Sequence, residues 1–134
     1  FLNVREKLSL CYYAGSAYHR LKGLITVSSG IEFENYDRAV EEIFRQLEAL
    51  QKGEWEDWEL TGARESLLSS LRTMEDSPSS LEDFVVGQAA AGSGETIPGL
   101  IAALQGVTPQ RIREAAQAVK PDTIYFLKGK EAQA

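Results

Sequence analysis

Apolar residues follow two different spacings along this chain, and each spacing predicts a type of secondary structure. Two short runs near the N-terminus, Leu10–Ala17 and Leu24–Ser29, are rich in apolar, aromatic and β-branched residues. A short polar connection that ends at Gly23 joins them. Two extended runs joined by such a short loop are typical of a β-hairpin.

Between Asn35 and Gly53 the apolar residues recur every three or four positions, which predicts an amphipathic helix. Asn35 suits the N-cap, and Gly53 suits the C-terminal end. The opposite face is charged, and we expect its acidic pair, Glu41 and Glu42, to be solvated. The apolar stripe consists of Val40, Ile43, Phe44, Leu47 and Leu50.

Two further helices are expected in the middle of the chain. The first runs over about Asp57–Met74 and is stopped at Pro78. Ser79 and Ser80, each followed three residues later by an acidic residue, resemble a capping box. They predict that the next helix begins there and continues to Ala89.

The C-terminal third predicts two helices and one strand. A short helix carries the apolar residues of Ile97–Leu104. Thr108–Pro109 places an N-cap residue before a proline, which indicates the start of another helix, and Pro121 ends it. The apolar run Thr123–Leu127 then predicts a final strand.

Strands near both ends with helices between them predict an α+β fold, in which an antiparallel sheet has helices packed on one face. The length of 134 residues, with 43% apolar and 25% charged residues, predicts one domain over residues 1–134. The chain opens inside an apolar segment at Phe1, without an initiator Met. We therefore expect it to be a piece of a longer protein.

Charge and composition argue against several classes of partner. The net charge is −6 and the sequence has no basic stripe, so nucleic-acid binding is not expected. No apolar run is long enough to span a bilayer, which argues against a membrane protein. The single cysteine, Cys11, cannot form an internal disulfide and fits a cytoplasmic location.

Common catalytic and metal sites find little support in the sequence. His19 is the sole histidine, so we expect no metal site and no cofactor bound by these residues. A nucleophilic pair of Cys11 and His19 would lack an evident orienting carboxylate. The glycine-rich stretch Gly92–Thr96 lacks the lysine and the glycine spacing of a phosphate-binding loop.

The most specific candidate is a pair of hydrogen-bond donors near the N-terminus. Arg5 is followed seven residues later by Tyr12, where a helical segment gives way to a strand. A guanidinium and a phenol can both donate to a peptide carbonyl and stabilise its negative charge during attack. From the spacing alone, a surface arginine and an ordinary strand tyrosine remain the simpler interpretation.

The residues around this pair favour the functional interpretation. The segment Val4–Tyr13, with the sequence VREKLSLCYY, resembles a signature in the non-catalytic half of the pitrilysin/insulinase family of zinc metallopeptidases. The resemblance continues through Lys22–Gly23, the strand that ends at Ser29–Ile31, and Val107–Pro109 before the last helix. It covers nearly the whole chain in order.

The resemblance implies that two similar α+β domains form a clamshell around a peptide. One half holds zinc through an H-x-x-E-H motif, and the other contributes the arginine and the tyrosine. Arg5 and Tyr12 would then be the substrate-binding residues, as the charged and the neutral donor. Tyr13 leaves open which phenol faces the chamber, although the spacing favours Tyr12. H-x-x-E-H is absent from this sequence, so zinc and the catalytic residues would belong to an N-terminal catalytic domain or a homologous partner subunit.

Three functions follow from the resemblance. The first is most of the C-terminal, substrate-clamping domain of a zinc metalloendopeptidase that acts on peptides or unfolded proteins, with this piece inactive by itself. The alternative is a domain of a non-catalytic family member that serves as the partner of an active homologue. A third is a structural subunit similar to the core proteins of respiratory complexes, favoured if Arg5 and Tyr12 are buried within the domain.

Overall fold

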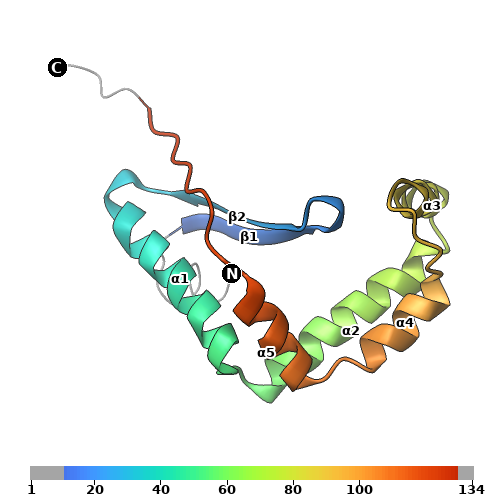
Figure 1. The fold of residues 1–134 in the computed structure, drawn as a ribbon. Helices are drawn as coiled ribbons and strands as arrows, with labels where there is room; N and C mark the ends of the chain where they lie inside the picture. The colour runs from blue at the N-terminus through green and yellow to red at the C-terminus, as the bar shows by residue number, and fades with distance from the viewer. Residues whose placement is uncertain (1–10, 130–134) are drawn as a thin grey trace. The chain divides into compact units, whose positions relative to one another are not determined.

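The computed structural model of the chain describes residues 11–129 (Figure 1). Over this range it contains two antiparallel strands and five α-helices, which confirms the predicted α+β class. The chain divides into two compact units, Phe1–Gln51 with Ala116–Ala134, and Lys52–Ala115. Each unit is described separately below, and the single domain over residues 1–134 stays a prediction.

The predicted β-hairpin is confirmed. Strand β1 spans Cys11–His19 and strand β2 spans Leu24–Ile31, and they pair antiparallel. A single 3-10 turn, Arg20–Lys22, connects them, and the backbone N–H of Gly23, a residue at φ 61°, donates to the carbonyl of Arg20. A residue with a Cβ atom is strained in this left-handed conformation, whereas glycine is not. Gly23 therefore fits the position where the chain reverses.

The strand pairing contains one irregularity, and it falls at Tyr12. Tyr13 pairs with Gly30, whereas Cys11 pairs with Ile31, so two steps along β1 match one step along β2. Tyr12 is therefore the extra residue of a β-bulge. Bulges change the direction of side chains and occur often beside functional sites.

Helix α1 spans Tyr36–Lys52, as the apolar spacing predicted, and follows directly on a 3-10 turn at Phe33–Asn35. The buried side of α1 differs from the predicted stripe. Ala39 and Glu42 are buried, whereas Phe44 and Leu50 are exposed.

The expectation that Glu42 is solvated was wrong, because a partner in the next turn compensates its charge. The guanidinium of Arg45 donates to both carboxylate oxygens of Glu42, at 2.7 Å each. The side-chain amide of Gln46 donates to Glu42 Oε1, also at 2.7 Å. A carboxylate can be buried when it is paired and hydrogen-bonded in this way.

The predicted final strand at Thr123–Leu127 was wrong. Residues 119–129 have no regular secondary structure, and the described sheet has only β1 and β2. This segment lies along α1 instead. Gln51 Nε2 donates to the carbonyls of Ala116 and Val119 near one end of α1. Near the other end, the ring of Phe126 packs against Tyr36, with centroids 4.4 Å apart.

The second unit consists of helices. Helix α2 packs against α3 and α4. The buried apolar residues of this unit are Leu68 of α2 and Ile97 of α4. No helix among residues 11–129 is both long enough and apolar enough to cross a bilayer. The helices are α2 (Asp57–Met74), α3 (Pro78–Ala90), α4 (Ile97–Gln105) and α5 (Pro109–Ala118), the last of which crosses the boundary between the units.

The helix starts confirm two predictions and correct a third. Helix α2 has the predicted bounds, and Thr108 Oγ1 accepts the backbone N–H of Arg111 at the start of α5. The predicted capping box at Ser79 and Ser80 was wrong: Ser77 is the N-cap of α3 and accepts the N–H of Ser80. Pro78 thus occupies the first turn of α3, where its missing N–H needs no partner.

Candidate functional site

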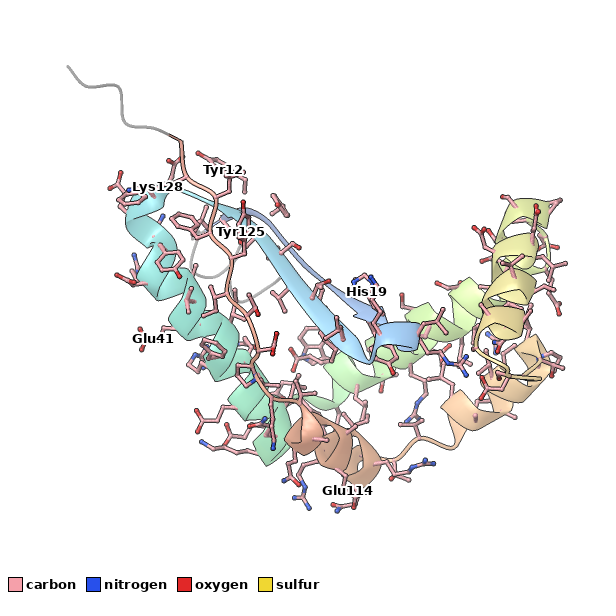
Figure 2. All side chains as sticks on the ribbon, turned by 45° about the horizontal axis from the view of Figure 1, so that its top comes forward. Tyr12, His19, Glu41, Glu114, Tyr125 and Lys128 are labelled. Carbon is pink, nitrogen blue, oxygen red and sulfur yellow. The ribbon has the colours of Figure 1, made fainter. Side chains whose placement is uncertain are left out.

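The candidate site lies at one end of the hairpin in the first unit. Figure 2 shows Tyr12, Tyr125 and Lys128 at this end, and His19 at the other. Three segments meet there: the bulge in β1, the turn that follows β2, and the extended segment after α5. We call this end the Tyr12 end.

Tyr12 and Glu32 form the main polar contact of the Tyr12 end. The Tyr12 hydroxyl donates a hydrogen bond to Glu32 Oε1, and both side chains are exposed to solvent. This hydrogen bond raises the pKa of Tyr12 above its ordinary value, and the negative charge of Glu32 and a small loss of hydration act in the same direction. The phenol is therefore protonated at neutral pH and able to donate.

The backbone of Glu32 is held by contacts of the turn that follows it. Glu32 is extended, at φ −69° and ψ 147°, and immediately precedes the 3-10 turn. Its carbonyl accepts the N–H of Asn35 at 3.0 Å. The next residue, Phe33, stacks on Phe126 with centroids 6.1 Å apart, and Lys128 Nζ lies 4.5 Å from the Phe33 ring centroid. These contacts fix the turn from which Glu32 projects.

Tyr13 is held differently from its neighbour. A Cβ atom built on Gly30 would lie 2.5 Å from Tyr13 Cε1, so the Tyr13 ring covers the glycine on the paired strand. Ser29 Oγ also donates to the Tyr13 carbonyl at 3.0 Å. The ring of Tyr13 thus packs on the hairpin, whereas the hydroxyl of Tyr12 is held by a surface carboxylate.

Arg5, the other predicted substrate-binding residue, lies outside the described residues. Its convergence with Tyr12 on one peptide therefore stays a prediction. The assignment of Tyr12, in preference to Tyr13, to substrate binding stays a prediction too.

The described residues do not fit a zinc ion. His19 is the single imidazole of the sequence, and its Nε2 is hydrogen-bonded to Thr26 Oγ1 at 3.0 Å. Over residues 11–129 no three His, Cys, Asp or Glu side chains gather as a metal ion would require. His19 and Cys11 are at opposite ends of β1, so the strand also separates the two members of the nucleophilic pair considered above.

Glu32 is the residue of the site that sequence analysis missed. The signal that could have found it is the hairpin register. The pairs His19–Leu24 and Tyr18–Ile25 extrapolate to a place for Tyr12 beside the end of β2, next to Glu32. The bulge and the hydrogen bond itself leave no such trace in the sequence.

Comparisons with known proteins agree with this fold. The family described as "Peptidase M16 inactive domain" matches residues 1–67. A Bacillus subtilis (strain 168) protein named "Probable inactive metalloprotease YmfF" is 37% identical over 131 residues, which are 98% of this chain and 31% of that protein. A crystal structure of a conserved protein from Enterococcus faecalis V583 aligns with a TM-score of 0.78 and 29% identity, over 87% of this chain and 28% of that one.

This chain thus spans less than a third of each of these two relatives. The family match begins at the segment that carries the arginine–tyrosine signature and extends through the hairpin, α1 and the start of α2. It confirms the resemblance to the pitrilysin/insulinase peptidases, and specifically to their non-catalytic half. The chain therefore belongs to the family of the peptidase M16 inactive domain.

Proposed function

We propose that this chain is part of a non-catalytic M16-type protein that binds extended peptides and acts as the partner of a zinc-containing homologue. The observation that carries the proposal is the relative that is 37% identical over almost the whole chain and is named a probable inactive metalloprotease. It favours the second of the three sequence-based functions over a fragment of an active peptidase. The catalytic zinc would belong to the homologue.

The environment of Tyr12 supports a role in peptide binding. A purely structural subunit was to be favoured if Arg5 and Tyr12 proved buried within the domain. Tyr12 is 69% exposed, and Arg5 lies outside the described residues. The phenol lies on a β-bulge and keeps its proton at neutral pH. In the proposed complex it donates to a peptide carbonyl, and Arg5 supplies a second, charged donor.

Peptide binding by the full-length protein tests this function. We expect Tyr12→Phe to weaken the binding of a fluorescein-labelled, unstructured peptide by about three- to tenfold, the scale of one net hydrogen bond. Tyr13→Phe is the matched control, because it removes a hydroxyl from the adjacent residue and leaves the ring on Gly30. Fluorescence anisotropy measures both affinities. Equal affinities of the Tyr12→Phe variant and the parent would refute the role of Tyr12.

Hydrolysis assays separate the non-catalytic partner from an active peptidase. We expect the full-length protein with added zinc to leave the peptide intact, and expect cleavage only after a zinc-containing homologue from the same organism is added. Cleavage by the isolated full-length protein, abolished by a chelator, would restore the active-peptidase function.

A further inference from the structure

The hydroxyl of Tyr12 can donate one hydrogen bond, and Glu32 accepts that hydrogen bond. A tyrosine hydroxyl carries a single donor, and an ionised carboxylate can only accept. Tyr12 therefore cannot donate to Glu32 and to a peptide carbonyl at the same time through two normal hydrogen bonds. In the structure, the hydroxyl proposed to donate to a peptide is thus already hydrogen-bonded to Glu32.

We propose that Glu32 is a latch on Tyr12: the carboxylate accepts the hydrogen bond of the phenol in the peptide-free protein and gives up this hydrogen bond when a peptide carbonyl replaces it as the acceptor. This inference rests on the proposed peptide-binding function and adds its regulation. It assigns a role to Glu32, which the sequence motif does not include.

Two features of the Tyr12 end fit a latch that opens readily. Glu32 is exposed, so water can solvate its carboxylate once the phenol leaves. Its backbone is fixed independently of the side chain, through the bond from Asn35 N–H to the Glu32 carbonyl and the packing of Phe33 on Phe126. Removing the carboxylate therefore leaves in place the backbone contact that forms the turn.

The latch reduces the fraction of the protein whose phenol is free to bind a peptide. The apparent affinity for the peptide falls in proportion to that fraction. Glu32→Ala is therefore expected to tighten peptide binding by about three- to tenfold, and Glu32→Gln, whose amide oxygen still accepts, by less. Glu34→Ala is the matched control, since it removes an exposed acidic side chain two residues further along the same turn. It corrects for the change in net charge.

A double-mutant cycle in the full-length protein, measured by anisotropy with the fluorescein-labelled peptide, tests the latch. Glu32→Ala is expected to tighten binding when Tyr12 is present and, in the Tyr12→Phe background, to have no effect beyond that of Glu34→Ala. Weaker binding of Glu32→Ala would overturn the latch and make Glu32 a residue that positions the phenol for binding. An effect equal to that of Glu34→Ala would also overturn it.

Titration of the Tyr12 phenol tests the latch without any peptide. With tyrosine labelled at the ring carbon that bears the hydroxyl, NMR resolves each phenol, and Tyr12→Phe identifies the signal. We expect Tyr12 to titrate at higher pH in the parent protein than in Glu32→Ala. Identical titration would overturn the latch whatever the peptide data show. If the titration differs but Tyr12→Phe binds peptide normally, the hydrogen bond stands, while the proposed function and the gating of peptide both fail.

Discussion

Two residues of the first unit, Glu42 and Gly30, show how a partner decides which residue a position can hold. Glu42 is only 6% exposed because Arg45 binds both of its carboxylate oxygens. The same hydrogen bonds, and then the attraction between the charges, raise the pKa of Arg45, which keeps its guanidinium charged. Gly30 depends on a partner in another way, since the Tyr13 ring occupies the space that a side chain would need.

Substitution of Gly30 tests the contact with Tyr13. Gly30→Ala places a methyl group against the ring, so the ring must move and its packing on the hairpin is lost. Gly15→Ala, in the paired strand, meets no atom within 4 Å and is the matched control. We expect Gly30→Ala to lower the free energy of unfolding by about 1 kcal/mol relative to Gly15→Ala, as for other overpacked sites.

Urea unfolding measures this difference, and the aromatic NMR signals of Tyr13 report the movement of its ring. Equal stability of the two alanine variants, with unchanged Tyr13 signals, would show that the ring does not cover Gly30 in solution.

Among the elements, the segment after α5 is the one whose role differs most from its sequence pattern. Residues 123–127 have the composition of a strand, yet the segment makes no ladder with β1 or β2. Phe126 holds it instead, by contacts with Phe33 in the 3-10 turn and with Tyr36, the first residue of α1. Because Glu32 immediately precedes Phe33, this segment also supports the turn that carries the latch.

Replacement of Phe126 tests this attachment. Phe126→Ala removes two ring contacts from a half-buried side chain, and we expect it to lower the free energy of unfolding by about 1–2 kcal/mol. Leu127→Ala is the control, because Leu127 is 78% exposed. Hydrogen exchange should increase at Asn35, whose N–H bonds to Glu32, only in Phe126→Ala. A Leu127→Ala variant that is destabilised as much would contradict the attachment.

For the whole molecule, the aromatic residues happen to divide between the two compact units. Trp55 and Trp58 both lie in Lys52–Ala115, whereas all five tyrosines lie in the other unit. Both boundaries fall at helices: α1 ends at Lys52, and α5 contains Ala115 and Ala116. Tryptophan and tyrosine signals thus report separately on the two units.

The predicted single domain over residues 1–134 requires the two units to unfold together. We expect the tryptophan fluorescence and the near-ultraviolet tyrosine signal to follow one urea transition with the same midpoint, as in two-state unfolding. Leu68→Ala, which creates a cavity in the second unit, should then shift both signals equally. Separate midpoints, or a shift confined to the tryptophan signal, would show two independently folding domains.

Local patterns were enough to predict the elements that depend on local interactions. The bounds of α2, the start of α5 at Pro109 and the hairpin around Gly23 follow from apolar spacing, helix caps and a left-handed glycine, all of which act within a few residues. Tyr12 became a candidate from its spacing to Arg5 and from the family signature, and its role in substrate binding stays a prediction.

Only the tertiary structure decided the rest, because the deciding partners are distant in sequence or invisible to hydropathy. Tyr12 meets Glu32 across the hairpin, and the bulge that makes Tyr12 the extra residue depends on the pairing of β1 with β2. Glu42 is charged, yet its pairing with Arg45 allows it to be buried. Residues 123–127 are not a strand because a strand needs a hydrogen-bonding neighbour, and Phe126 packs on α1 instead. The sequence thus determined the local elements and the family, whereas contacts between segments determined how Tyr12 is held.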